Sequence, residues 1–200
     1  MRILPMGLSA VIVEEPLPTP AAWALGLRGL DLPGVADVVP AAETVLVRCA
    51  DAASLNDVLA HLDDVVPVSV AEATGTVTID VVYDGEDLAE VAEATDLGVD
   101  DVAELHSGAD YRVAFCGFAP GFGYLTGLPD ELRLPRRSSP RTQVPAGAVA
   151  MAASYTAVYP RPSPGGWHLI GTTGHVLFDV ERDPPAVLQP GTAVRFRRMA

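Results

Sequence analysis

The first part of the chain alternates short aliphatic runs with longer segments whose apolar residues recur at helical spacing. The aliphatic runs are rich in β-branched residues and have the length of strands. The three predicted strands are Leu8–Val13, Val45–Cys49 and Thr76–Tyr83. The predicted helices are Ala21–Leu30 and Ala52–Leu62. This pattern predicts a small α+β layer in which two helices pack on one side of a sheet.

A second pattern begins after Asp84-Gly85, a dipeptide that is typical of turns. Two short acidic helices are predicted at Asp87–Ala94 and Asp100–Leu105, and their acidic residues are interpreted as a solvated face. We therefore expect a domain boundary at this dipeptide, with an N-terminal α+β domain over residues 1–84 and a second domain over residues 85–200.

The rest of the chain consists of short apolar runs that are separated by glycine and proline. The predicted strands are Tyr111–Phe118, Ala148–Ala153, Thr156–Tyr159, Trp167–Ile170, Val176–Val180 and Ala193–Phe196. Several short strands with little helix predict a β-barrel or a sandwich. The expected fold class is α+β, with a small N-terminal α/β sandwich-type domain followed by a β-rich domain.

Charge and composition restrict the classes of function. The 200 residues carry a formal net charge of -13, so the surface as a whole should repel nucleic acid and anionic lipid. All 13 basic residues are arginine, which leaves no lysine for a Schiff base or for a P-loop. Anion recognition must therefore use guanidinium groups or backbone N–H groups. We expect no nucleic-acid partner.

The chain is expected to be cytoplasmic. Residues Met1–Glu15 lack the pattern of a signal peptide, and no apolar run is long enough to span a bilayer. Cys49 and Cys116 lie far apart and match no zinc spacing, so they are interpreted as reduced thiols. No metal motif is found, and no metal site is predicted.

Positive charge gathers in one segment of this acidic chain. No Asp or Glu occurs between Glu131 and Asp179, and the segment Pro135–Gly147 (PRRSSPRTQVPAG) places three arginines among three prolines. Arginines on a proline-stiffened loop lose little entropy on binding, which suits a site for a carboxylate or a phosphate. The alternative is that these arginines pair with the acidic residues of the preceding helices, and the sequence leaves both interpretations open.

Several long motifs in a fixed order resemble a known family. They are Leu105–Ser107, Gly117–Leu125 (GFAPGFGYL), Pro135–Gly147, Val158–Pro160, Pro164–Trp167 and Pro190-Gly191. The chain resembles the B subunit of the bacterial ATP-dependent 5-oxoprolinase, whose relatives are called allophanate hydrolase subunit 1 and the sporulation-kinase inhibitor KipI. The resemblance covers nearly the whole chain and implies an N-terminal α+β domain followed by a cyclophilin-like β-barrel.

The resemblance also implies an activity and partners. Family members hydrolyse 5-oxo-L-proline to L-glutamate with ATP, together with a C subunit and an A subunit. ATP would be used by the complex, because this chain shows no nucleotide fingerprint: Gly121-x-Gly123 is followed by neither a helix nor a third glycine. The alternatives are hydrolysis of allophanate and inhibition of a sensor histidine kinase, with Phe118 and Phe122 as the docking face.

The candidate site residues come from these motifs. His106 is a candidate general base, against the alternative of a helix C-terminal cap, and Arg137 and Arg141 could converge on one anion. These three are the predicted catalytic residues. The predicted substrate-binding residues are Phe118, Phe122, Tyr124, Arg136 and Tyr159.

The sequence departs from the family pattern in two places. Gly171-Thr172-Thr173-Gly174 stands where relatives usually carry an arginine, and Ala153 and Ala157 occupy positions where glycine is expected. The alanines should be tolerated unless the backbone there requires a positive φ.

Overall fold

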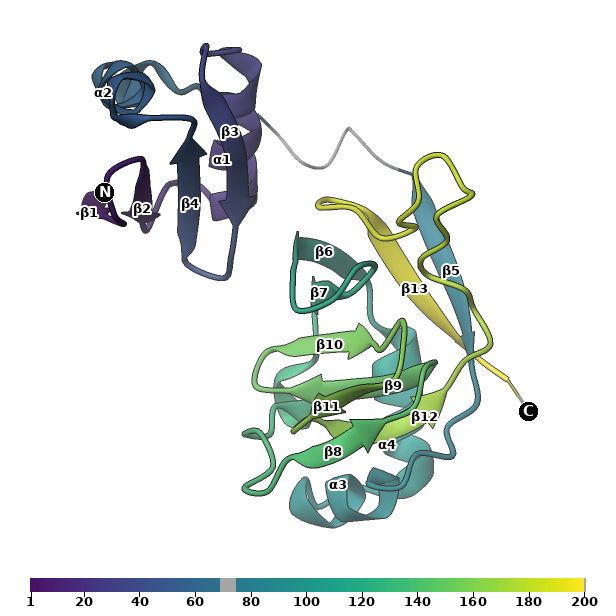
Figure 1. The fold of residues 1–200 in the computed structure, drawn as a ribbon. Coiled ribbons are helices and arrows are strands. Elements are labelled where there is room, and N and C mark those ends of the chain that lie inside the picture. The colour runs from purple at the N-terminus through teal and green to yellow at the C-terminus, as the bar shows by residue number, and fades with distance from the viewer. Residues whose placement is uncertain (69–74, 200) are drawn as a thin grey trace. The chain divides into compact units, whose positions relative to one another are not determined.

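The computed structural model describes residues 1–68 and 75–199 and divides into two compact units, Met1–Ala73 and Thr74–Ala200 (Figure 1). The elements of the first unit are β1 (Arg2–Pro5), β2 (Ala10–Glu14), α1 (Pro20–Gly29), β3 (Val35–Pro40), β4 (Thr44–Cys49), α2 (Ala52–Ala60) and a 3-10 turn (Leu62–Asp64). The four strands form an antiparallel sheet in the order β1-β2-β4-β3.

Both helices of the first unit pack on the same face of its sheet. Alternate residues of the strands, such as Val13 and Val47, are fully buried against α1 and α2, as the period of two along a strand requires. Helix α1 begins where the Thr19 hydroxyl accepts a hydrogen bond from the Ala22 N–H. Helix α2 begins where the Asp51 carboxylate accepts one from the Ser54 N–H at 2.8 Å. The predicted α+β layer with helices on one side is therefore confirmed.

The second unit is rich in short strands. Its elements are β5 (Thr76–Val81), α3 (Leu88–Ala94), α4 (Val99–Gly108), β6 (Tyr111–Cys116), β7 (Gly123–Thr126), a 3-10 turn (Asp130–Leu132), β8 (Arg141–Val144), β9 (Ala148–Ala152), β10 (Tyr155–Val158), β11 (Ser163–Gly165), β12 (His168–Thr172) and β13 (Ala193–Arg198). Seven strands form one sheet in the order β12-β9-β10-β7-β6-β13-β5, and β11 pairs with β8 separately.

The seven-stranded sheet closes on itself as a barrel. The two outer strands of the sheet are β5 and β12. Val82, directly after β5, forms an antiparallel bridge with Thr172 at the end of β12. The Val82 N–H donates to the Thr172 carbonyl at 2.9 Å, and the Thr172 N–H donates back at 2.8 Å. This single bridge nearly closes the barrel and pairs the ends of its two outer strands, where an unpaired edge would be a site of aggregation. The structure confirms the predicted barrel and the α+β class.

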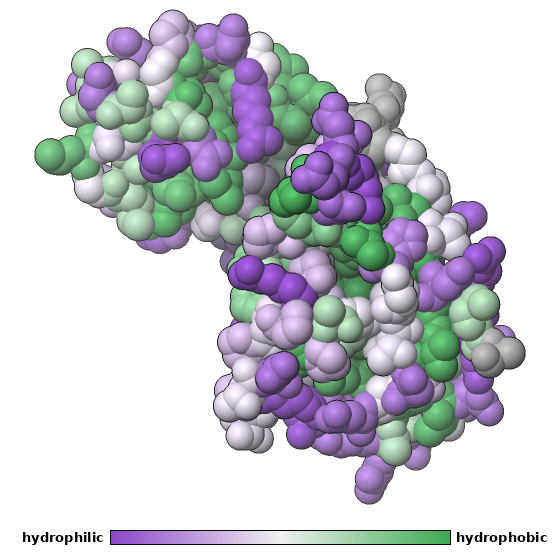
Figure 2. All heavy atoms as spheres, turned by 45° about the vertical axis from the view of Figure 1, so that its right-hand side comes forward, coloured by the Kyte–Doolittle hydropathy of each residue, from purple (hydrophilic) through white to green (hydrophobic). Residues whose placement is uncertain are grey.

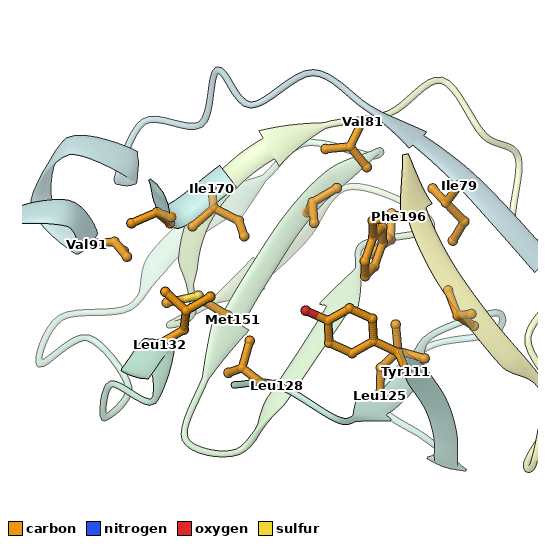
Figure 3. Packing of buried hydrophobic residues seen from close by; sticks show 14 of the residues in the cluster. Ile79, Val81, Val91, Tyr111, Leu125, Leu128, Leu132, Met151, Ile170 and Phe196 are labelled. Atoms are coloured by element: carbon orange, nitrogen blue, oxygen red, sulfur yellow. The ribbon is translucent and has the colours of Figure 1, made fainter. Parts of the chain in front are cut away.

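The interior of the barrel is filled by large apolar side chains. Figure 3 shows Ile170, Met151, Leu128 and Phe196 pointing into the space between the strands. The Tyr111 ring packs edge-on against Phe196, with ring centroids 5.2 Å apart. Helix α3 packs on β12, and α4 packs on α3 and β13. Buried residues of both helices, such as Val91 and Val102, belong to the same core cluster as the barrel side chains.

The surface of each unit mixes residue types. On the face shown in Figure 2, hydrophilic and hydrophobic residues are interspersed over both units. No helix within residues 1–68 and 75–199 has the length and the apolar composition that crossing a bilayer requires.

The boundary between the units lies before β5, whereas the sequence placed it after this strand, at Asp84-Gly85. Strand β5 pairs in parallel with β13, from Thr76 opposite Ala193 to Val81 opposite Arg198. It therefore belongs to the barrel and not to the N-terminal sheet. The local hydrophobic pattern predicted this strand correctly, but β13, the strand that it pairs with, lies at the other end of the chain.

One predicted strand is wrong and five short strands were missed. Val176–Val180 contains only an isolated bridge between Phe178 and Ala186. Strands β1, β3, β7, β8 and β11 were not predicted, because they carry proline, glycine or charged residues that weaken the strand pattern.

Ala153 gives a direct test of backbone strain. The residue lies in the turn after β9 at φ 52, the left-handed region in which a Cβ atom is crowded. We expect Ala153→Gly to raise the free energy of unfolding by about 0.5–1 kcal/mol, because relief of the strain exceeds the entropic cost of glycine. Urea denaturation measures the change.

Ala157→Gly is the matched control for this substitution. Ala157 is fully buried within β10 and has no positive φ, so glycine there should lower the free energy of unfolding by about 1 kcal/mol. Equal effects of the two substitutions would contradict the assignment of strain to Ala153.

Candidate functional site

A small cavity in the second unit is lined by aromatic side chains and one arginine. Its volume is about 80 Å³. The lining residues, here called the aromatic cavity, are Phe118, Phe122, Tyr124, Arg136, Tyr159, Pro164, Gly165, Gly166 and Trp167. All five predicted substrate-binding residues are among them, although they come from separate segments of the chain.

The rings of the cavity hold one another in place by edge-to-face packing. Phe122 is 2% exposed, and its ring centroid lies 5.3 Å from that of Tyr159 and 5.8 Å from that of Trp167. Tyr124, in β7, packs against the edge of Trp167 at 5.7 Å and stacks on Phe115 at 4.3 Å. Such contacts fix ring orientation as well as burying apolar area. The cavity is therefore a preformed feature of the barrel.

Glycine at position 165 is required by the cavity wall. A Cβ atom at Gly165 would lie 2.3 Å from the Tyr159 hydroxyl oxygen. Strand β11, which contains Gly165, pairs with β8 so that Gly165 is opposite Arg141. The Arg137 N–H donates to the Gly166 carbonyl at 2.8 Å. These bonds attach the arginine-rich segment to one wall of the cavity.

Arg136 is the charged residue of the cavity. It is exposed and makes no ion pair within the part of the chain that the structure describes. Burial raises the pKa of the Tyr124 and Tyr159 hydroxyls, and the nearby Arg136 guanidinium partly offsets this rise in pKa. Both hydroxyls therefore remain protonated at neutral pH and can donate hydrogen bonds. The cavity combines flat apolar walls, hydroxyl donors and one positive charge.

Arg137 and Arg141 face a different partner, the carboxylate of Asp87. Arg137 Nη1 and Arg141 Nη2 both donate to Asp87 Oδ1, each at 2.7 Å. The Leu169 N–H donates to Asp87 Oδ2, also at 2.7 Å. The side chain of Asp87 is 4% exposed, so these three donors hold a charge that has lost its water. We call Asp87, Arg137 and Arg141 the carboxylate cluster.

The electrostatics of the carboxylate cluster favour the ionised acid. Burial raises the pKa of the Asp87 carboxyl, but the hydrogen bonds from Arg141 and the Leu169 N–H, together with both guanidinium charges, outweigh burial and lower the pKa below its usual value. The exposed acids Glu90 and Glu86 add outer contacts to Arg137 at 2.7 Å and to Arg141 at 3.4 Å. The structure thus shows the pairing alternative for these two arginines, and not their convergence on an open anion site.

Two nitrogen donors of the carboxylate cluster are unpaired within the described part of the chain. Arg137 Nε and Arg141 Nη1 are buried and make no hydrogen bond within the described residues. The guanidinium charge of Arg141 also acts on the Tyr159 hydroxyl, whose pKa it lowers against the effect of burial. Arg141 is paired opposite Gly165, a residue of the cavity wall that lies against the Tyr159 hydroxyl, so the cluster borders the aromatic cavity on this side.

Sequence reasoning missed the role of Asp87. It was interpreted as part of a solvated acidic face, yet it is among the most buried acids of the chain. A usable signal was the charge imbalance: the acid-free stretch after Glu131 carries several arginines, whereas acids are concentrated in α3 and in the residues before it.

His106 lies in the core and not at a surface site. Its exposure is 0%, and its ring lies beside Phe196 with centroids 4.6 Å apart. His106 Nδ1 is 2.7 Å from the Tyr83 hydroxyl, and Nε2 is 2.9 Å from Thr156 Oγ1. Because the Thr156 hydroxyl donates to the Ala150 carbonyl at 3.0 Å, it must accept from His106 Nε2–H.

The bonding pattern of His106 defines a neutral ring. With Nε2 carrying the proton, Nδ1 accepts from the Tyr83 hydroxyl, and burial lowers the pKa of His106 to about 3. Both ring nitrogens are engaged and no solvent reaches them, so this geometry does not offer His106 to a substrate. The predicted general base is corrected to a buried polar residue that joins α4 to β10.

Cys116 is a free, partly buried thiol. Its Sγ donates to the Leu188 carbonyl at 3.4 Å, and burial raises the pKa of the thiol to about 11. A nucleophilic cysteine needs a lowered pKa.

Comparison with known proteins places these features in a family. The family model for the carboxyltransferase domain, subdomain C and D, matches residues 1–188. The 5-oxoprolinase B subunit of Escherichia coli O157:H7 is 42% identical over 203 residues, covering 96% of this chain and 93% of the relative. The protein of the same name from Haemophilus influenzae is 35% identical over 208 residues, covering 98% and 97%.

A solved structure shares the fold. The crystal structure of the protein TTHA0988 matches with a TM-score of 0.83 and 37% identity over 96% of this chain. The chain spans 40% of the length of that protein.

The neutral state of His106 predicts a pH dependence of stability. Its pKa is about 3 when folded and 6.5 as the reference for the unfolded chain, so between these values the unfolded state binds more protons. The contribution of His106 is complete above pH 6.5 and is lost as pH falls, at up to about 1.4 kcal/mol per pH unit. Urea denaturation between pH 7 and pH 5 measures this slope. A His106→Asn variant with the wild-type slope would contradict the prediction.

The carboxylate cluster predicts a large cost for loss of the Asp87 charge. We expect Asp87→Asn to lower the free energy of unfolding by about 3 kcal/mol, because two partly buried guanidinium groups lose their shared anion. The control is Asp80→Asn, which removes an exposed pair with Arg197 on the barrel surface and should change stability little. Equal effects of the two substitutions in urea denaturation would show that Asp87 is no more important than a surface acid.

Proposed function

Because this chain belongs to the family of the carboxyltransferase domain, subdomain C and D, we propose that it acts as the B subunit of an ATP-dependent 5-oxoprolinase. The complex would hydrolyse 5-oxo-L-proline to L-glutamate together with a C subunit and an A subunit. The observation that carries this proposal is the near-complete match to two proteins that are named as 5-oxoprolinase B subunits, at 42% and 35% identity.

The chemistry of the substrate explains the need for ATP. A lactam carbonyl is a poor electrophile. Transfer of the γ-phosphoryl group of ATP to its oxygen, with release of ADP, would activate the carbon for attack by water. The ring C–N bond then breaks with protonation of the amine, and hydrolysis of the resulting acyl phosphate releases phosphate and leaves glutamate. In this proposal the complex binds and uses ATP, and this chain helps to bind the substrate. No residue of this chain is given a role in phosphoryl transfer.

The aromatic cavity is the proposed contact of this chain with the substrate. 5-Oxoproline is a small, nearly flat ring with one carboxylate, and a cavity of about 80 Å³ accommodates part of such a ring. Arg136 supplies the charge that a carboxylate requires, and the Tyr124 and Tyr159 hydroxyls supply donors. Arg137 and Arg141 act on this site indirectly, because their charges are already paired with Asp87.

Docking to a sensor histidine kinase through Phe118 and Phe122 receives less support. Phe122 is 2% exposed, so it cannot form part of a docking face. Phe118 alone, at 57% exposure, presents little apolar area to a protein partner.

Reconstitution tests the proposed function. We expect ATP-dependent release of glutamate from 5-oxoproline by this chain when it is co-expressed with A and C subunits, measured by enzymatic assay of glutamate. Omission of this chain should abolish the release. Full turnover by the A and C subunits alone would contradict the proposal.

Arg136→Gln tests the assigned contact within that assay. Loss of a charge-assisted contact to the substrate carboxylate should raise KM for 5-oxoproline by about tenfold. The control is Arg133→Gln, in the same segment, where an exposed arginine pairs with Asp130 and does not line the cavity. The same KM for the two variants would remove Arg136 from the site.

A further inference from the structure

The loop that carries Phe118 contains a rare backbone turn. Phe118 has φ 68, and the Ala119 N–H donates to the Gly117 carbonyl at 2.7 Å. A hydrogen bond that encloses a single residue at positive φ defines the less common form of the γ-turn, which is strained. For a bulky aromatic residue this conformation is a marked outlier.

Neighbouring bonds fix the strained turn. The Gly117 N–H donates to the Phe122 carbonyl at 3.2 Å, and the Phe122 N–H donates to the Ala119 carbonyl at 3.0 Å. Gly121, at φ +82, packs so closely that a Cβ atom there would lie 2.6 Å from Phe178 Cβ. These contacts hold the residues on both sides of Phe118 and so support the strained turn.

The strained turn places the Phe118 ring at the mouth of the aromatic cavity. The ring centroid lies 5.2 Å from that of Phe122 and 6.2 Å from that of Tyr159, both edge-on. Phe118 is 57% exposed, whereas Phe122, Tyr159 and Trp167 are each at most 5% exposed. Burial of its own ring therefore offsets little of the strain, although the residue lines the cavity.

We propose that Phe118 is a specificity-determining residue, whose ring forms the outer wall of the aromatic cavity and contacts the flat ring of the bound substrate. This inference rests on the proposed function and deepens it. The γ-turn holds the ring at the entrance before the substrate arrives, so little side-chain entropy is lost on binding. The strain is the cost of that placement, and it is retained because a relaxed loop would direct the side chain elsewhere.

Two substitutions separate the ring from the strain. Phe118→Ala removes the ring and keeps a Cβ atom at positive φ, whereas Phe118→Gly removes the ring and also relieves the strain. In the reconstituted complex, both variants should raise KM for 5-oxoproline about fivefold with kcat unchanged. Phe118→Gly should unfold at a higher urea concentration than Phe118→Ala. An equally raised KM in two variants that differ in stability would assign the weaker binding to loss of the ring and not to a change in fold stability.

Ala153→Gly is the matched control for strain relief. It removes a positive-φ strain outside the aromatic cavity, so it should raise the urea midpoint and leave KM at the wild-type value. Co-purification of the A and C subunits is measured for every variant. Loss of either partner in both Phe118 variants would assign the ring to contact with that partner and overturn the inference.

The outcomes distinguish this inference from the proposed function. A wild-type complex without turnover overturns the proposed function, and the inference falls with it. Wild-type turnover with KM unchanged within about twofold in both Phe118 variants overturns the inference alone. A urea midpoint of Phe118→Gly at or below that of Phe118→Ala overturns the part played by strain.

Discussion

The buried carboxylate of Asp87 joins three parts of the second unit that are far apart in the sequence. Its two oxygens accept hydrogen bonds from Arg137, Arg141 and the Leu169 N–H, so the start of α3, the arginine-rich segment and β12 meet at one charge. A carboxylate that is 4% exposed has lost most of its hydration and must be paired by donors in fixed positions. The aromatic cavity depends on this cluster, because Arg141 is opposite Gly165 in the β8–β11 ladder and the Arg137 N–H binds the Gly166 carbonyl.

The carboxylate cluster also separates the arginines of the arginine-rich segment into two that are paired and one that is not. Two guanidinium groups neutralise Asp87 and are thereby fixed, while Arg136 extends to the cavity without an ion pair among the described residues. A single unpaired charge beside protonated tyrosines fits the small monoanion of the proposed function better than three free arginines would, because several free arginines attract polyanions. Because Arg137 and Arg141 are paired with Asp87, the unpaired charge that this segment presents to the cavity is that of Arg136.

The sequence predicted most of the fold, because hydrophobic periodicity records burial. The two N-terminal helices and the strands β2, β4, β5, β6, β9 and β13 follow from apolar spacing, and Asp51 correctly marked a helix start. Partners were harder to predict than elements. Strand β5 was assigned to the wrong sheet because its neighbour β13 lies at the opposite end of the chain, and no local pattern contains that pairing.

The candidate site was likewise predictable only where local sequence was sufficient. The cavity residues lie in recognisable motifs, but the burial of Asp87 and His106 depends on tertiary contacts that their own segments do not reveal.

Positive φ angles at non-glycine residues of this chain differ in their steric cost. Five non-glycine residues among those described have positive φ, and two of them are Asp31 and Asp96, whose short polar side chains tolerate this conformation best. Ala153 has a small side chain, so its cost is modest, and family relatives are expected to carry glycine there. Phe118 is different, because an aromatic residue bears a high steric cost and its ring recovers little of that cost through burial. A glycine at position 118 would adopt this backbone conformation without that steric cost, so any benefit of the phenylalanine must come from its ring, which packs edge-on against Phe122 and Tyr159.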